Sequence, residues 1–158
     1  MRAIVFSDSH GNYDVLENIM ERHKDDGDIF IHLGDGEREL ELIKYVYNDK
    51  KILFVAGNCD WGTDMPDYDI IKFGGKTLFF THGARFGVKN DLVMAKFFAR
   101  KNEADILLFG HTHIAMTDYD DGLYIMNPGS CGKPRDGGPS YGIIDITEAG
   151  IAMHTVEI

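Results

Sequence analysis

The chain has 158 residues, 44% of them hydrophobic and 27% charged, which predicts one globular domain over residues 1–158. Its formal net charge of −10 makes a long nucleic acid an unfavourable partner, because phosphate backbones attract basic surfaces, but it does not exclude small phosphate esters. No apolar run reaches the roughly 20 residues that span a bilayer, and no targeting signal is visible, so we expect no membrane contact and a cytoplasmic location.

The first half of the chain alternates apolar strands with amphipathic helices. Strands are expected over Ala3–Phe6, Ile29–Leu33 and Lys51–Ala56. Helices are expected over Tyr13–His23, capped by Asn12, and from about Glu37 to Tyr47. This alternation predicts a parallel sheet with crossover helices.

The second half is richer in hairpin signals. Strands are expected over Asp69–Phe73, Lys76–Thr81, Ala104–Phe109, Ile114–Asp118, Leu123–Met126, Tyr141–Ile146 and Ile151–Val156. A helix is expected from Asn90 to about Asn102, with Leu92, Met94, Phe97 and Phe98 as its apolar anchors, and a loop over Asn127–Pro139. We therefore expect two sheets, one mostly parallel from the first half and one richer in hairpins from the second, with helices over the outer faces.

Five of these strands end in a small or polar residue that is followed by a potential metal ligand. The ligand candidates are Asp8, His10, Asp35, Asn58, His82, His111 and His113. Ligands gather beyond the carboxyl ends of strands in α/β sheets, so these side chains should meet. Carboxylate, imidazole and amide donors suit Mn, Fe, Zn, Co or Ni. Seven ligands are too many for one catalytic ion with an open position, but they fit two ions that share a bridging carboxylate.

Two of the candidates, His111 and His113, follow the apolar run Ile106–Phe109 and flank Thr112. In an extended turn, alternate side chains point to the same side. Both imidazoles are therefore expected to face the metal site.

The order of the motifs along the chain is more specific than any one of them. The blocks Asp8-Ser9-His10, Gly34-Asp35, Gly57-Asn58-Cys59-Asp60, Thr81-His82-Gly83 and Gly110-His111-Thr112-His113 resemble those of the calcineurin-like metallophosphoesterases. The short chain is similar to the small single-domain phosphodiesterase branch of that family. The resemblance implies a four-layer α/β/β/α sandwich with two mixed β-sheets and the metal site at the C-terminal ends of the strands.

The resemblance also implies a ligand set and cofactors. Asp8, His10 and His113 would hold one ion, Asn58, His82 and His111 would hold the second, and Asp35 would bridge them, so that His111 and His113 serve different ions. The implied cofactors are two divalent ions, with Mn preferred and Ni, Fe, Zn, Co or Mg as alternatives.

The implied function is the hydrolysis of small phosphodiesters by in-line attack of a metal-bridging hydroxide. A phosphomonoesterase, a dinucleoside polyphosphatase, a nuclease and a non-catalytic scaffold like the retromer subunit of this fold stay open as alternatives, as does a homo-oligomer. The catalytic candidates are Asp35, Asn58, Cys59, Asp60 and His82, and the substrate-binding candidates are Asn58, Arg85 and Arg135.

Two positions depart from the family pattern. Cys59 stands where many relatives carry a histidine that assists the leaving oxygen, and a thiol is a poorer proton source. We therefore expect good leaving groups, of the aryl or pyrophosphate type, to be favoured. Ala84 stands where relatives of the small branch often carry a second histidine, and Arg85 beside it is a candidate for a phosphate oxygen.

Several polar residues are assigned from their local context alone. Asp60 is expected to orient a neighbour or cap a turn, and Lys133 and Arg135 to steer an anionic substrate. Because His32 lies within an apolar strand, it is expected to be a hydrogen-bonded core residue, whereas His23 and His154 are expected at the surface.

Overall fold

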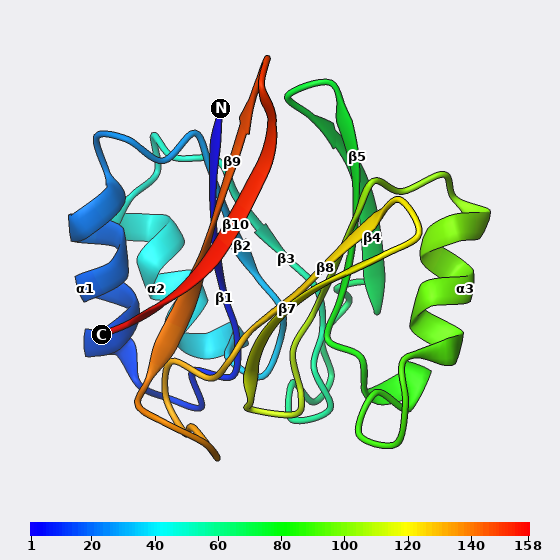
Figure 1. Ribbon diagram of the computed structural model, residues 1–158. Helices are drawn as coiled ribbons and strands as arrows, with labels where there is room; N and C mark the ends of the chain where they lie inside the picture. Colours follow the sequence, from blue (N-terminus) through cyan, green and yellow to red (C-terminus); the bar gives the residue numbers. More distant parts are fainter.

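The computed structural model describes residues 1–158 and contains two five-stranded mixed sheets packed face to face between helices (Figure 1). The first sheet has the order β10-β9-β1-β2-β3, with bounds β1 Arg2–Phe6, β2 Ile29–His32, β3 Ile52–Phe54, β9 Ser140–Thr147 and β10 Gly150–Glu157. The second has the order β4-β5-β6-β8-β7, with bounds β4 Tyr68–Phe73, β5 Lys76–Thr81, β6 Ile106–Phe109, β7 Ala115–Asp120 and β8 Leu123–Pro128. The two mixed sheets confirm the predicted fold class.

Helices cover the outer face of each sheet. Helices α1 (Tyr13–His23) and α2 (Glu37–Val46) lie on the first sheet, and α3 (Val93–Lys101) lies on the second (Figure 1). A short 3-10 helix, η1 (Ala84–Phe86), precedes α3. Helix α1 begins as predicted, because the Asn12 side chain accepts a hydrogen bond from the Val15 amide. None of these helices has the length and apolarity needed to cross a membrane.

Three apolar clusters hold the four layers together. The largest lies between the sheets and includes Val5, Ile31 and Leu108. A second fills the space under α1 and α2, and a third lies under α3. The apolar residues of β1, β2 and β6 are buried on both faces, which explains why these strands read as continuous apolar runs. Such buried strands give their carboxyl ends a rigid base.

The pairing of the last hairpin differs from the expected division into first and second halves. Strand β9 pairs antiparallel with β1, so the hairpin β9–β10 extends the first sheet. In addition, β3 is shorter than expected, at Ile52–Phe54. Strand β8 continues through Asn127 and Pro128, which were expected in the following loop.

Two further expectations about burial are wrong. In α3, the anchors Met94 and Phe97 are 50% and 58% exposed, and the buried residues are Ala95 and Ala99. Their spacing of four places these small side chains on the face toward the sheet. His23 is buried, because the Tyr141 hydroxyl of β9 and the Asp26 carboxylate each lie 2.9 Å from one of its ring nitrogens.

Candidate metal centre

The loops that follow β1, β2, β3, β5 and β6 meet at one edge of the sandwich and carry all seven predicted ligands. Backbone hydrogen bonds tie these loops to one another. The Asp8 amide donates to Gly34 O, and the His10 amide donates to Asp35 O, each at 3.0 Å. The Gly110 amide donates to His82 O at the same distance. The His111 amide also donates to Asp8 Oδ2, and the Cys59 amide donates to Asp35 Oδ1, so the five strand ends form one connected platform.

One group of donors consists of Asp8, His10 and His113. Asp8 Oδ1 lies 3.1 Å from His113 Nε2 and 3.8 Å from His10 Nε2, and the two imidazole nitrogens are 3.3 Å apart. The other carboxylate oxygen, Oδ2, accepts hydrogen bonds from Ser7 Oγ and the His111 amide. The buried Oδ1 has no hydrogen-bond partner, and no other buried side-chain nitrogen or oxygen lacks one.

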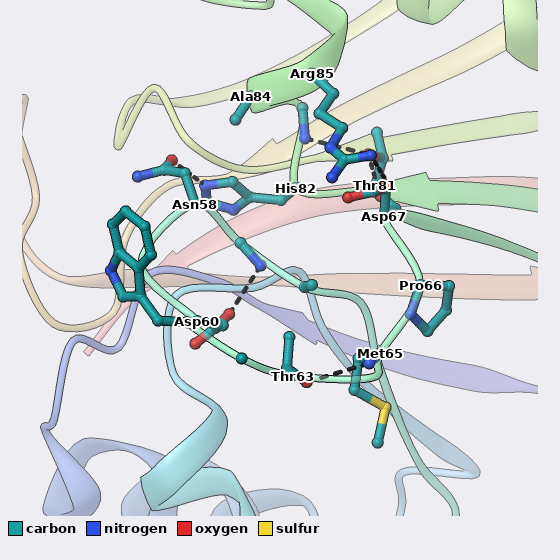
Figure 2. A pocket seen from close by; sticks show the side chains of 15 residues that line it. Asn58, Asp60, Thr63, Met65, Pro66, Asp67, Thr81, His82, Ala84 and Arg85 are labelled. Carbon is teal, nitrogen blue, oxygen red and sulfur yellow. Dashed lines mark hydrogen bonds and ion pairs between the residues drawn. The ribbon is translucent and has the colours of Figure 1, made fainter.

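A second group consists of Asn58, His82 and His111. His82 Nε2 lies 3.1 Å from Asn58 Oδ1 and 3.1 Å from His111 Nδ1. Figure 2 shows the Asn58 amide beside the His82 ring. Because His82 Nδ1 donates to Leu33 O at 2.8 Å, Nε2 is left with its lone pair directed at this group.

The carboxylate of Asp35 lies between the two groups. Its Oδ2 is 3.8 Å from His10 Nε2 and 3.5 Å from His82 Nε2, while its Oδ1 accepts a hydrogen bond from the Cys59 amide. A side chain at Gly57 would place a Cβ 2.1 Å from this Oδ1, so only glycine allows the close approach.

Five of the seven candidate ligands have a left-handed backbone. Their φ angles are 55° for Asp8, 48° for His10, 59° for Asp35, 66° for His111 and 61° for His113. The extended turn expected around Thr112 is therefore wrong. His111 turns toward His82, and His113 turns toward Asp8 and His10. Gly110 permits this turn, because a Cβ there would lie 2.1 Å from Ser7 Oγ.

The electrostatics of the site favour a charged Asp8 and neutral imidazoles at His10 and His111, whereas the hydrogen bond to Asp8 raises the pKa of His113. Burial alone would raise the pKa of Asp8, but His113, His82 and Ser7 outweigh it, so this pKa is lowered. Burial lowers the pKa of His111 to about 4, with the neighbouring His82 as the next cause, and burial also lowers the pKa of His10. Neutral imidazoles are the form that ligates a metal.

Buried residues outside the sequence motifs support the ligands. His32 Nδ1 accepts a hydrogen bond from the Gly34 amide, so its Nε2 donates to Ser9 Oγ at 2.9 Å. Ser9 Oγ in turn donates to Glu39 of α2 at 2.6 Å. This series of hydrogen bonds confirms that His32 is a hydrogen-bonded core residue. The same bonds hold the segment between Asp8 and His10. The apolar context of His32 was the only sequence signal for it.

The carboxylate of Asp60 is fully used by backbone amides. It accepts hydrogen bonds from the amides of Asp35, Gly36, Glu37 and Gly57 at 2.7–3.0 Å. These bonds outweigh the effect of burial and lower the pKa of Asp60. Asp60 therefore caps the start of α2 and fixes Asp35. The sequence predicts Asp60 both as a catalytic candidate and as a residue that orients a neighbour or caps a turn. The geometry matches the second role.

Cys59 and the cationic candidates lie around the donor groups. Partial desolvation by the surrounding site, followed by a hydrogen bond to the Asp35 carboxylate, raises the pKa of the Cys59 thiol to about 11. The Arg85 guanidinium lies 2.6 Å from Asp67 in an ion pair (Figure 2). Arg135 is exposed, and its amide donates to His113 O. The Lys133 carbonyl accepts a hydrogen bond from His113 Nδ1 at 2.5 Å, which leaves His113 Nε2 free to ligate.

These donors match what a divalent cation requires. Asp8 Oδ1 is a buried carboxylate oxygen without a donor, and imidazole nitrogens with free lone pairs surround it. Asp35 supplies a second buried carboxylate, which is grouped with Asp8 and His82. An arrangement of this kind is costly without a cation, so the Asp and His groups are placed to bind metal.

Comparison with known proteins agrees with this geometry. Residues 1–149 match the model of the calcineurin-like phosphoesterase superfamily domain. The chain belongs to this superfamily. Among curated calcineurin-like relatives, it is 36% identical to the probable metallophosphoesterase YsnB of Bacillus subtilis, over 85% of this chain and 78% of that protein. It is 27% identical to the phosphodiesterase YfcE of Escherichia coli, over 92% and 88% of the two chains.

Solved structures show the same calcineurin-like fold. A conserved protein of Streptococcus pneumoniae, described as a phosphoesterase from its sequence, superposes with a TM-score of 0.85 and 26% identity, over 99% of this chain and 88% of that one. Vps29 of Entamoeba histolytica in complex with Zn superposes with a TM-score of 0.75 over 99% and 98% of the two chains. At 19% identity, the second likeness extends to the fold alone.

Proposed function

We propose that this phosphoesterase-family chain is a two-metal phosphodiesterase that hydrolyses small phosphodiesters. The observation that carries the proposal is the position of Asp35, whose Oδ2 lies within 3.8 Å of His10 Nε2 and 3.5 Å of His82 Nε2. A single carboxylate placed between two donor groups is the arrangement that two ions sharing a ligand require.

In this proposal Asp8, His10 and His113 hold one divalent ion, Asn58, His82 and His111 hold the other, and Asp35 contacts both. When bound, the ions lower the pKa of a water molecule and polarise the phosphoryl oxygens. The oxygen and nitrogen donors favour Mn, with Ni, Fe, Zn, Co and Mg as alternatives.

The chain's own residues prepare the site for a phosphate ester. Asn58 offers a neutral oxygen, so it adds no negative charge that would repel the substrate. Lys133 O and Leu33 O fix the ring orientation of His113 and His82. The pKa of about 11 at Cys59 supports a preference for acidic leaving groups, because this thiol donates a proton poorly.

A scaffold function like that of the retromer subunit is the second candidate. Such a scaffold does not need its metal ligands, whereas all seven candidates are present here and lie at one edge of the sandwich. The intact donor set therefore favours the enzyme.

The test is a metal-dependent assay with bis(p-nitrophenyl) phosphate. Wild type should be active with Mn²⁺ and weaker with Mg²⁺, and Asp35→Asn should reduce kcat by on the order of 100-fold or more, because it weakens both ligand groups. Aryl diesters with less acidic leaving groups should react more slowly.

Asp64→Asn is the matched control, because it makes the same chemical change at an exposed residue of the loop that carries Asn58. It should keep wild-type activity. Full activity of Asp35→Asn, or a wild type that no metal stimulates, would contradict the two-metal proposal.

A further inference from the structure

Trp61 is the most exposed large apolar side chain of the molecule, at 89%, and it is the only tryptophan. It directly follows Asp60, whose carboxylate is held by four backbone amides. The indole therefore projects from an anchored base, although its burial elsewhere would be favourable. Exposure of a single aromatic side chain is common and by itself indicates no site.

The position of Trp61 relative to the donor groups is what indicates a role. A hollow of about 390 Å³ contains Asn58 and His82 of the second group (Figure 2). Another hollow of about 360 Å³ contains His10 and Asp35. Trp61 and Asp60 are the two residues that line both hollows. The indole thus stands at the boundary between the two spaces that open on the candidate metal ligands.

Two kinds of side chain line the first hollow, polar metal-ligand candidates and an aromatic ring. Asn58 and His82, which the proposed function assigns to a metal ion that would bind the phosphate, line one part of the hollow, and the indole of Trp61 supplies a large aromatic face. Both hollows are of the size that holds a small ligand. An aromatic side chain beside a phosphate site suits a planar group attached to that phosphate, and base–aromatic stacking contributes about 1–3 kcal/mol.

We propose that Trp61 is a specificity-determining residue that stacks on the nucleobase of a short nucleotidyl phosphodiester bound at the candidate metal centre. This inference rests on the proposed phosphodiesterase function. A nucleobase supplies the planar face, and the net charge of −10 favours a mono- or dinucleotide ester over a long polymer.

The test compares two ligands that differ only in the base. Adenosine 5′-monophosphate and ribose 5-phosphate are titrated into Zn²⁺-loaded protein by calorimetry and by tryptophan fluorescence, excited beyond the absorption of adenine. Wild type should bind the nucleotide about 5- to 100-fold more tightly, and only the nucleotide should quench the emission of the sole tryptophan.

Variants then assign the difference to the indole. Trp61→Ala should lose the 5- to 100-fold preference without change in the affinity for ribose 5-phosphate, and Trp61→Phe should recover part of it. Tyr45→Ala is the control, because Tyr45 is 82% exposed on α2 and lines neither hollow. It should bind both ligands as wild type does.

Three outcomes would overturn the inference: no nucleotide binding, equal affinities of wild type for the two ligands, or an unchanged nucleotide affinity in Trp61→Ala. A tryptophan emission that changes when the protein is diluted, but not when the nucleotide is added, would also overturn the inference. That result would place Trp61 in a contact between copies of the chain. The diester assay separates the two proposals. Failure to hydrolyse bis(p-nitrophenyl) phosphate rejects the phosphodiesterase, whereas the titration decides the role of Trp61.

Discussion

At the scale of single residues, the candidate metal centre concentrates backbone strain. Seven non-glycine residues have a positive φ, and five of them are candidate ligands. A left-handed non-glycine residue costs roughly 1–3 kcal/mol, although Asp and His tolerate it better than branched residues. The surrounding hydrogen bonds between loops hold these conformations. The residue types of the ligands could be predicted from the sequence, but not this backbone geometry, because no local pattern specifies it.

The buried His32 makes stability depend on pH. Burial lowers the pKa of His32 from its ordinary value of about 6.5 to about 4. Between these values the unfolded chain binds a proton that the folded chain does not, so stability is present above about pH 6.5 and is lost as the pH falls toward 4. A shift of this size corresponds to roughly 3 kcal/mol.

We expect the metal-free wild type to lose free energy of unfolding steeply across this pH range, measured by urea titration. His32→Gln should be less stable than wild type near neutral pH, because it disturbs the bonds to Gly34 and Ser9, but its slope should be flatter. His154→Gln is the control at an exposed histidine and should keep the wild-type slope. Parallel slopes for wild type and His32→Gln would contradict the assignment.

At the scale of elements, local signals predicted position better than orientation. Helix α1 begins and ends where the Asn12 cap and the apolar spacing place it. In α3 the apolar residues predicted Met94 and Phe97 as anchors on the sheet, whereas the buried residues are Ala95 and Ala99. Small residues at a spacing of four carry little hydrophobic signal, so the packed face of this helix is decided by close approach to the sheet and not by side-chain size.

The start of α2 depends on a residue from another loop. No side chain within α2 or at its N-cap Gly36 caps it, and Asp60 accepts the amides of Gly36 and Glu37 in its place. Asp60→Ala should therefore destabilise the protein by about 2–4 kcal/mol, because buried amides lose a charged acceptor. It should also lower phosphodiesterase activity, since the Asp35 amide is released.

Thermal unfolding measures the first effect, and a fall in melting temperature of about 5–15 °C is expected for a chain of this length. Asp60→Asn should lie between wild type and Asp60→Ala, because it keeps one acceptor oxygen but loses the charge. Asp64→Ala, in the same loop, should melt within about 2 °C of wild type. A wild-type melting temperature for Asp60→Ala would show that Asp60 does not anchor this loop.

At the scale of the whole molecule, the decisive contacts join distant parts of the chain. Strand β9 pairs with β1 across more than 130 residues, and Arg2 forms an ion pair with Asp145 at 2.8 Å. The sequence predicted the last hairpin but not its sheet, because a hairpin with alternating apolar residues can extend either edge. The burial of His23 has the same origin, since its partner Tyr141 belongs to β9. The position of the site was more predictable than the pairing of this hairpin. Parallel strands bring their carboxyl ends together whichever strand pairs at the edge of the sheet.

The same long-range assembly makes metal binding a global stability term. The folded chain buries Asp8 and Asp35, and Asp8 Oδ1 lacks a hydrogen-bond partner, so a bound cation should stabilise the folded state and not the unfolded one. At a metal concentration of 100 times Kd the gain is about 2.7 kcal/mol, or roughly 5–10 °C in melting temperature. Differential scanning fluorimetry with Mn²⁺ against a chelator measures this gain. Asp8→Asn should lose most of it, and Asp64→Asn should retain it. An equal shift in all three proteins would mean that the ion binds elsewhere, because only the first substitution alters the buried donor group.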